Sequence, residues 1–179
     1  MTVENVINRY DSLSLIDSIT KSTGTTAYTA GDAVSEVTTN DYFTFGNTDT
    51  QPVCRFKSHP TGIITGARIT SSANQSTKLD GQLILFNTAF AETADNDPWA
   101  VTDAALLTRV GSINFPAANW YAGTPTAGAG GNAFCDVDNL GLVYTVGADK
   151  VLYGQLVARN AYTPVDSEVF TITLLVTLD

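Results

Sequence analysis

Apolar and polar residues alternate over several short stretches of the chain, most clearly in the last one. From Ser167 the sequence runs SEVFTITLLVTL, in which apolar residues occupy every second position and threonines fill most of the positions between them. A repeat of two residues is the period of a β-strand with one buried face. The pattern therefore predicts a final strand whose apolar face is formed by Phe170, Ile172, Leu174, Val176 and Leu178.

Two similar runs precede the last strand. LGLVYTV covers 140–146 and VLYGQLVAR covers 151–159, and the segment between them, GADK, is a turn signal. Two strands joined by a short turn are typical of a β-hairpin. We therefore expect the last third of the chain to form an antiparallel meander.

The middle of the chain carries further strand patterns. LDGQLILFN places Leu79, Leu83 and Leu85 on one face, and shorter alternations occur around Phe43 and Phe45 and around Cys54 and Phe56. The polar link SANQSTK joins that run to an earlier one, TGIITGARITSS. The earlier run alternates Ile63, Ala67 and Ile69 with Ile64, Arg68 and Thr70.

One segment has helical features. Asp97 is suited to an N-cap and Pro98 to the first helical position, and WAVTDAALLT follows with good helix formers. The stretch 121–133, YAGTPTAGAGGNA, lacks periodicity and reads as a flexible surface loop. At least seven strands, one short helix and no βαβ alternation predict an all-β protein, an antiparallel β-sandwich that is jelly-roll-like.

The length of 179 residues suits one sandwich domain. We expect that domain to cover residues 25–179, with residues 1–24 forming an N-terminal arm or a first strand. Within 1–24, Val3, Val6 and Ile7 lie among polar residues, so this segment could lie along a neighbouring molecule as a strand or a short helix. We list these three as candidate partner contacts.

Charge and composition exclude several classes of function. The net charge is -9 and the nine basic residues are scattered, which argues against nucleic-acid binding. The N-terminus carries charges where a secretory signal needs an apolar run, and the uncharged stretch 110–135 contains Pro116 and Pro125, which do not suit a membrane span. We expect a soluble protein whose Cys54 and Cys135 are buried, reduced thiols.

The inventory of reactive groups predicts no enzyme. The one histidine, His59, precedes a proline and suits a strand cap better than a general base. Carboxylates at alternate positions could hold Ca²⁺ or act as a hydrolytic pair, but ordinary solvated loop carboxylates explain them equally well. These are Glu92, Asp95, Asp97, Asp136 and Asp138. We therefore assign no catalytic residue, no metal ligand and no cofactor.

Trp120 and Tyr121 form an aromatic pair beside the expected loop. Such a pair could stack on a sugar or anchor a protein partner, although packing into the core at a strand end is the commoner fate of such residues. We retain both residues as candidate partner contacts.

A short motif occurs twice, as TAYTAGDAV at 26–34 and within NAYTPVDSEV at 160–169. Both copies lead through a bend to an apolar strand, and the flanking residues do not align, which favours two turns over an internal duplication. We expect Tyr28 and Tyr162 each to cover a strand end, with the ring packed and the hydroxyl in water.

The ordered segments AYTAGDAV, GIITGARITSS, LILFN, TDAALLTRVGSINF and LYGQLVARNAYTP, followed by the threonine-alternating last strand, resemble a family of tailed-bacteriophage virion proteins. Its members are capsid decoration (cement) proteins or other structural proteins. The resemblance covers roughly residues 25–179 and includes no residue-level site motif. Residues 1–24 match nothing in it.

The resemblance implies a non-enzymatic subunit, commonly a homotrimer. Such a subunit is made in the host cytoplasm and sits on the outer capsid surface of the virion, where it binds the major capsid protein and bridges capsomers. The alternative is a phage head-fibre or tail-associated module that binds the host or a carbohydrate, for which Trp120 and Tyr121 are the motivation. Neither alternative involves a membrane or nucleic acid.

Overall fold

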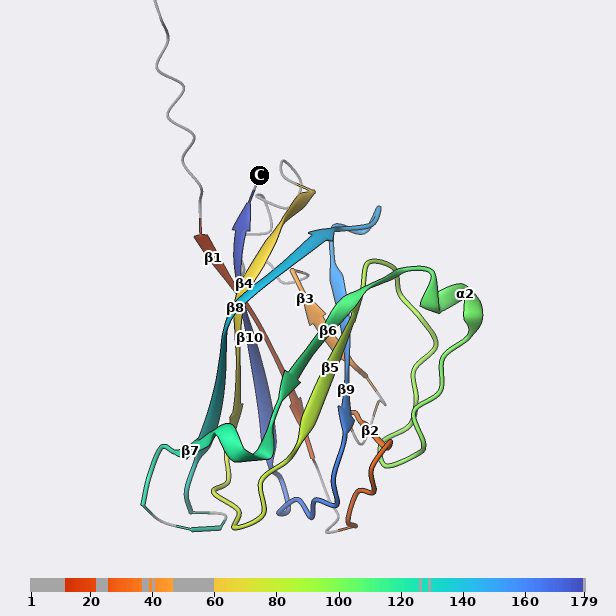
Figure 1. Cartoon of the computed structure of the whole chain (residues 1–179). Helices are drawn as coiled ribbons and strands as arrows, with labels where there is room; N and C mark the ends of the chain where they lie inside the picture. Colours follow the sequence, from red (N-terminus) through yellow and green to blue (C-terminus); the bar gives the residue numbers. More distant parts are fainter. Residues whose placement is uncertain are drawn as a thin grey trace, which may run out of the picture.

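Strands dominate the structure and form two facing antiparallel sheets (Figure 1). The computed structural model describes residues 12–21, 26–36, 39, 41–46, 60–125, 127–128 and 130–178. One sheet has the strand order β1-β10-β4-β8-β7, and the other has the order β2-β9-β5-β6, with β3 also paired to β9. The strands are β1 (Ser12–Thr20), β2 (Ala33–Val34), β3 (Phe43–Phe45), β4 (Thr61–Ser71), β5 (Gly81–Phe86), β6 (Arg109–Phe115), β7 (Trp120–Ala122), β8 (Ala133–Thr145), β9 (Leu152–Ala158) and β10 (Val169–Leu178).

The order of pairing defines the topology. The first described strand, β1, pairs with the last, β10, and the next, β2, pairs with β9. The connections β4–β5, β8–β9 and β9–β10 each cross from one sheet to the other. First strands paired with last ones, and chain crossings between two sheets, are the features of a jelly roll. The prediction of an all-β, jelly-roll-like antiparallel sandwich is confirmed.

The core lies between the two sheets. It is built from alternate residues of both inner faces, among them Leu15 of β1, Ile172 of β10, Leu83 of β5 and Phe115 of β6. The predicted apolar face of the last strand is confirmed, because all five of its apolar residues are buried. The leucines predicted to share a face in 79–85 are buried there too.

The C-terminal hairpin prediction is wrong. β8 pairs with β4 and β7, whereas β9 pairs with β5, β2 and β3 in the opposite sheet. The segment GADK does turn the chain, and Lys150 donates its backbone N–H to the carbonyl of Gly147 at 3.1 Å. A turn signal shows that the chain reverses, but it does not show whether the next strand continues in the same sheet. The meander is therefore replaced by a crossing between sheets.

A β-bulge changes which isoleucine of β4 enters the core. The pairing register of β4 with β8 shifts between Ile64 and Gly66, so the alternation resets at this point. Ile64 is 0% exposed and shares the inner face with Ala67, while Ile63 is 38% exposed on the outer face. The prediction that Ile63 lies on the same face as Ala67 and Ile69 is therefore wrong, because the bulge separates Ile63 from those two residues.

The helix is shorter and begins later than the sequence pattern predicts. The helix α2 (Asp103–Leu106) is a single turn, and its N-cap is Thr102, whose side chain accepts the backbone N–H of Ala105 at 3.2 Å. Asp97 instead accepts the backbone N–H of Ala33 at 2.8 Å through its own carbonyl. The segment around Pro98 is therefore extended beside 31–33, because backbone pairing there overrides the helical propensity.

The two sheets differ in what covers their outer faces. On the sheet that contains β5 and β9, Ile84, Phe86 and Val157 form a second buried cluster, against which Phe90 and Trp99 of the β5–β6 connection pack. Further aromatic contacts cover the same region, including Phe90 stacked on Tyr42 at a centroid distance of 4.4 Å. The β5–β6 connection thus shields this outer face, whereas no comparable cluster among the described residues covers the outer face of the sheet β1-β10-β4-β8-β7.

The two copies of the Ala-Tyr-Thr motif pair with each other. Tyr28 and Tyr162 form an antiparallel bridge in which the N–H of Tyr28 donates to the carbonyl of Tyr162 at 2.8 Å and the reverse bond measures 3.4 Å. Beyond them, β2 begins at Ala33 and β10 at Val169. The repeated Ala-Tyr-Thr motif therefore precedes two strands that start at the same end of the sandwich.

Several expectations fall partly or wholly on residues that the structure does not describe. Residues 12–20 form the strand β1 within the five-stranded sheet, while residues 1–11 of the expected arm or first strand lie outside the described residues. The division of the chain at residue 24 stays a prediction. His59, Cys54 and Phe56 also lie outside the described residues, whereas Cys135 is buried with a free thiol. Among the described residues, no helix has the length and apolarity needed to span a membrane.

The bulge in β4 leads to a testable prediction, for which the neighbouring residue Ile63 provides the control. Ile64→Ala should lower the free energy of unfolding by about 2–5 kcal/mol, because it empties space in a closed core. The neighbouring substitution Ile63→Ala should cost less than about 1 kcal/mol, since that side chain faces outward. Urea unfolding followed by circular dichroism measures both values, and equal losses would contradict the bulge.

Candidate binding surface

The most densely connected buried polar groups surround the paired tyrosines. The hydroxyl of Tyr28 donates to Oδ1 of Asp95 at 2.7 Å, and the hydroxyl of Tyr162 donates to Oε1 of Glu168 at 2.5 Å. Both tyrosines are at least 97% buried, as their exposed fractions are 1% and 3%. The expectation that these hydroxyls lie in water is therefore wrong. Each hydroxyl instead satisfies a carboxylate that the fold removes from solvent.

The remaining polar atoms of this cluster are also partnered. Asp95 accepts the backbone N–H of Ser35 at 3.1 Å and contacts the ammonium of Lys21, and Glu168 accepts the hydroxyl of Ser71 at 2.5 Å. Burial lowers the pKa of Lys21 to about 8, although the carboxylates around it oppose the shift. Because the side chains are buried and satisfy one another, this cluster stabilises one end of the sandwich and presents no reactive group to a substrate.

The carboxylates considered for calcium or hydrolysis do not form one site. Asp95 belongs to the buried cluster, Asp97 is exposed beside β2, and Asp136 forms an ion pair with Arg68 on the outer face of the five-stranded sheet. Glu92 lies near Asp41, and burial together with that carboxylate raises the pKa of Glu92. Within the described ranges, no three His, Cys, Asp or Glu side chains group as metal ligands would.

The structure separates the environments of Trp120 and Tyr121. Trp120 is partly buried against the core, and its indole N–H donates to the carbonyl of Leu79 at 2.8 Å. Tyr121 is 62% exposed, because neighbouring residues of β7 point to opposite sides of the sheet. Its ring lies 5.7 Å from that of Phe134 on β8, measured between centroids. The other candidate contacts, Val3, Val6 and Ile7, lie outside the described residues.

The outer face of the five-stranded sheet carries exposed aliphatic side chains. Ile16 of β1, Leu175 of β10, Ile63 of β4 and Val143 of β8 are between 38% and 66% exposed. The register places Val143 beside Ile63, so that these two form a continuous apolar surface. The side chains around them are mainly serine and threonine, such as those at 14, 18, 171, 173 and 177.

A sequence signal for this surface exists, although it is weaker than the signal for the core. Leu175 interrupts the threonines of β10, and Ile16 interrupts the serines of β1. Both are apolar residues at positions where the period-2 pattern demands a polar one. Arg68 and Phe134 give no comparable signal, because only the pairing of β4 with β8 brings them together.

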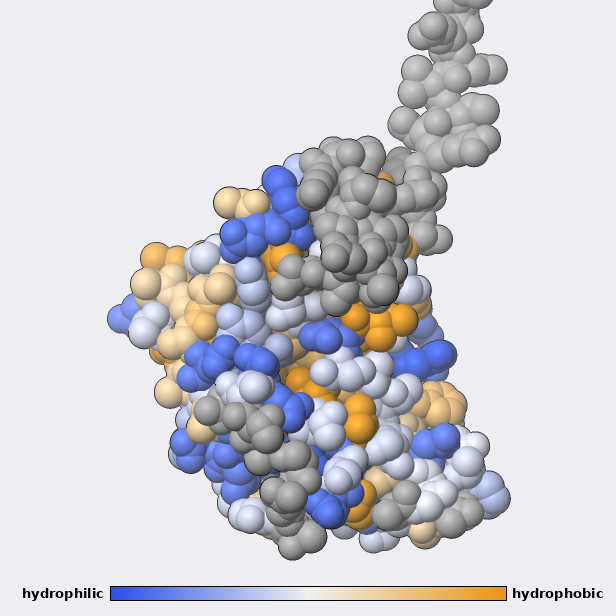
Figure 2. Space-filling view, turned by 180° about the vertical axis from the view of Figure 1, so that it is seen from behind, coloured by the Kyte–Doolittle hydropathy of each residue, from blue (hydrophilic) through white to orange (hydrophobic). Residues whose placement is uncertain are grey.

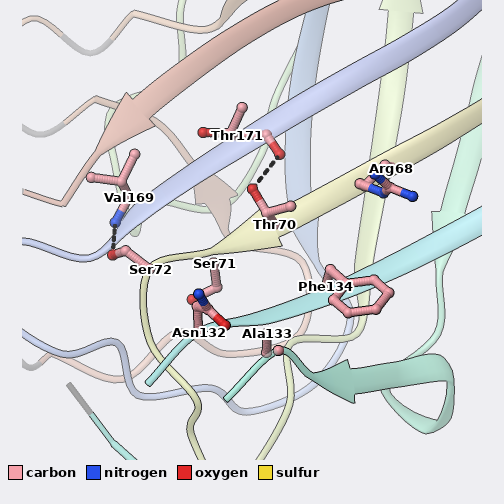
Figure 3. A pocket seen from close by; sticks show the side chains of 10 residues that line it. Arg68, Thr70, Ser71, Ser72, Asn132, Ala133, Phe134, Val169 and Thr171 are labelled. Atoms are coloured by element: carbon pink, nitrogen blue, oxygen red, sulfur yellow. Dashed lines mark hydrogen bonds between the residues drawn. The ribbon is translucent and has the colours of Figure 1, made fainter. Parts of the chain in front are cut away.

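A groove lies on the same outer face, toward the end where β10 begins. It has a volume of about 570 Å³. Arg68, Thr70, Asn132, Phe134 and Thr171 are among the residues that line it, and Figure 3 shows them on β4, β10 and the start of β8. The groove therefore combines an aromatic ring with hydroxyl, amide and guanidinium groups.

A further apolar feature lies at α2, away from the sheet face. Leu106 and Leu107 are 46% and 89% exposed at the end of this single helical turn. Figure 1 shows α2 projecting from the side of the sandwich, and hydrophobic atoms gather on that side of the molecule in Figure 2. The described surface thus has two candidate apolar contacts, the sheet face and the α2 turn.

Comparison with known proteins gives no family assignment. No family model matches the sequence, and no curated protein matches it. Among solved structures, similarity is found to the cyanophage Pam1 capsid asymmetric unit, at 15% identity over 95% of this chain and 86% of that chain with a TM-score of 0.36. Desmodium yellow mottle tymovirus matches at 16% identity over 99% and 92%, with a TM-score of 0.30.

The native virion of Kashmir bee virus matches at 13% identity over 95% of this chain and 71% of that chain, with a TM-score of 0.33. All three structures come from viruses. At TM-scores below 0.5 these likenesses carry no conclusion about this chain, and the jelly-roll assignment depends on its own strand order.

The tyrosine cluster predicts a specific loss of stability in alkali. Burial raises the pKa of both Tyr28 and Tyr162 above the ordinary value. Above about pH 10 the unfolded chain releases these protons while the folded chain retains them, so stability falls as pH rises. Tyr162→Phe should lower the free energy of unfolding by about 1–3 kcal/mol at pH 7 and should flatten its decline above about pH 10.

Urea unfolding at a series of pH values from about 7 to 11.5 tests this prediction. Tyr121→Phe is the matched control, because that side chain is exposed, and it should leave the stability at pH 7 almost unchanged. A Tyr162→Phe protein with the wild-type stability and the wild-type alkaline decline would contradict the assigned role.

Proposed function

We propose that this chain is a non-enzymatic structural component of a phage virion, a decoration (cement) protein that binds the outer capsid surface and bridges capsomers. The partner is the major capsid protein. Support comes from the ordered sequence segments that resemble virion structural proteins, and from a jelly roll in which the described residues leave aliphatic side chains exposed on one outer face. No catalytic role is assigned to any residue.

The observation that carries the proposal is the contrast between the two outer faces. The aromatic residues of the β5–β6 connection cover the sheet β2-β9-β5-β6, but the sheet β1-β10-β4-β8-β7 presents Ile16, Ile63, Val143 and Leu175 to solvent. Charged residues are depleted at the centres of protein interfaces, and aliphatic side chains exposed on a flat sheet favour a protein partner.

Charge supports the same assignment. The whole chain has a net charge of -9, yet the charged side chains on the outer face of the described five-stranded sheet are those of Arg68, Asp136 and Asp138. Arg68 and Asp136 are paired, with Nε 2.5 Å from Oδ1. A nearly neutral face allows a partner to approach without the repulsion or desolvation cost that a strongly acidic surface would impose.

The face is large enough for a specific contact. Five strands about 4.8 Å apart and about nine residues long cover roughly 24 Å by 30 Å, or about 700 Å². A standard interface buries about 800 Å² on each partner. One sheet face could therefore supply most of one contact, and bridging requires a second contact elsewhere on the same subunit.

The second contact is assigned to the N-terminal residues and to association between subunits. Val3, Val6 and Ile7 would bind a neighbouring molecule, and a homotrimer would present three copies of each surface to the capsid lattice. A protein that binds the assembled shell in preference to its separated subunits raises shell stability by mass action. This mechanism requires many bound copies of the protein and no catalysed reaction.

Reconstitution on undecorated capsids tests the proposed docking face. The wild-type protein should bind at stoichiometric copy number and raise the temperature at which the capsids disrupt. Val143→Asp should weaken binding by about tenfold or more, because it places an unpaired charge in the contact. The substitution leaves the core intact, since Val143 is 66% exposed.

Leu107→Asp is the matched control, because Leu107 is an exposed aliphatic residue on the α2 turn. It should bind capsids as the wild type does. If Leu107→Asp abolishes binding and Val143→Asp does not, the docking face has been assigned wrongly. Absence of any wild-type binding would overturn the decoration function itself.

The predicted homotrimer has its own measurement. Light scattering coupled to size exclusion should give about three times the 19.0 kDa chain mass, either in solution or for protein released from capsids. A mass of 19.0 kDa in both cases would contradict the trimer.

A further inference from the structure

The groove beside β7 has a chemical character that differs from that of the apolar docking face. Its lining comes from the ends of β4 and β8 and from the start of β10, together with the β7–β8 connection. Figure 3 shows Arg68 and Phe134 close to each other on one side and Asn132 on the other. The volume of about 570 Å³ falls within the range of small-molecule sites.

An aromatic surface forms one wall of the groove and continues beyond it. The rings of Phe134 and Tyr121 are inclined by 31° to each other at a centroid distance of 5.7 Å. Tyr121 is exposed, and the guanidinium carbon of Arg68 lies 5.7 Å from the centre of the Phe134 ring. Phe134 is half-buried, so the exposed ring of Tyr121 offers most of the flat surface, which suits the apolar C–H face of a sugar ring as well as it suits an aliphatic side chain.

The charge of the groove is balanced. Arg68 is the charged residue among those that line it, and its Nε and Nη2 atoms donate to the two carboxylate oxygens of Asp136 at 2.5 Å and 3.2 Å. An anionic ligand would need positive charge that is not already neutralised, and the net charge of -9 repels anions further. The groove therefore disfavours an anionic ligand, and the residues that line it include no carboxylate for a cation.

Polar groups face the aromatic wall. Thr70, Ser72 and Thr171 contribute hydroxyls, and Asn132 contributes a side-chain amide that can both donate and accept. Uncharged donors and acceptors next to a flat ring match a molecule that carries many hydroxyls around an apolar face. Sugars have this character, and the hydroxyl oxygens keep acceptor capacity beyond the bonds that they already make to Val169, to Ser18 and to the carbonyl of Thr171.

The backbone holds Asn132 in position. The N–H of Gly123 donates to the carbonyl of Asn132 at 2.9 Å, and the N–H of Asn132 donates to the hydroxyl of Thr124 at 3.2 Å. A methyl group at position 123 would collide with Oδ1 of Asn132. The amide can therefore occupy this place because residue 123 is a glycine.

We propose that the groove formed by Arg68, Asn132 and Phe134, extended by Tyr121, binds a neutral glycan. A sugar ring stacks on the aromatic wall, and its hydroxyls bond to the Asn132 amide and to the Arg68–Asp136 pair. This site goes beyond the decoration function, because the surface of a decorated shell would gain affinity for neutral polysaccharide.

The experiment uses the full chain on an array of neutral glycans, namely glucans, mannans and galactans, with heparin and polygalacturonate as anionic comparisons. A neutral glycan that binds is then titrated by calorimetry against the wild type and variants. Tyr121→Ala and Asn132→Ala should each weaken binding at least tenfold, and Gly123→Ala should weaken it by displacing the amide. Val143→Asp, on the same sheet but outside the groove, should leave glycan affinity within twofold of the wild type.

Circular dichroism and urea unfolding confirm that each variant is folded, and Tyr121→Ala is the safest of them because its side chain is largely exposed. Binding to no neutral glycan, or to the anionic polymers alone, would overturn the proposal, as would glycan binding that Tyr121→Ala and Asn132→Ala leave unchanged. Failure here is distinguishable from failure of the decoration function, since Asn132→Ala should bind capsids normally and Val143→Asp should not.

Discussion

The structure depends on the burial of the inner faces of its two sheets against each other. Each inner face supplies an apolar residue at every second position, and closing the two faces removes these residues from water together. Strands adjacent in the chain are therefore free to lie in opposite sheets, provided that each presents its apolar side inward. The crossings between β4 and β5 and between β8 and β9 satisfy this condition. Because the inner faces are apolar, side chains that could bind a partner or a ligand lie on the outer faces and at the ends of the sandwich.

At one end of the sandwich, polar groups perform a structural task. Closing that end brings the carboxylates of Asp95 and Glu168 out of water, and the fold supplies a tyrosine hydroxyl to each. A buried carboxylate that lost its hydroxyl partner would destabilise the folded state, because nothing would offset the free energy of removing its charge from water. This cluster of titratable side chains resembles an active site, but its role here is structural. It joins the 26–36 segment to the residues that precede β10.

The outer faces decide how the molecule can interact with others. One is covered by the connection that carries Phe90 and Trp99, so the apolar side chains of the sheet itself are buried there. The other is nearly neutral, with exposed aliphatic residues over part of its area and a polar, aromatic groove over another part. Docking to a shell and binding of a glycan could therefore use separate regions of a single sheet without competing for the same side chains.

The sequence by itself determined the strands, because burial on one side of a strand forces a period of two that can be read from residues such as Phe170, Ile172 and Leu174. It also determined that the protein is all-β, since no comparable helical period competes. Only the tertiary structure decided which sheet each strand joins, because a turn such as GADK reverses the chain equally well within a sheet or between sheets. The bulge that turns Ile64 inward, the pairing of Tyr28 with Tyr162, and the meeting of Arg68 with Phe134 likewise depend on contacts between residues far apart in the chain. Such contacts leave no local pattern, so the groove could not be predicted, whereas the exposed Ile16 and Leu175 do interrupt the polar positions of their strands.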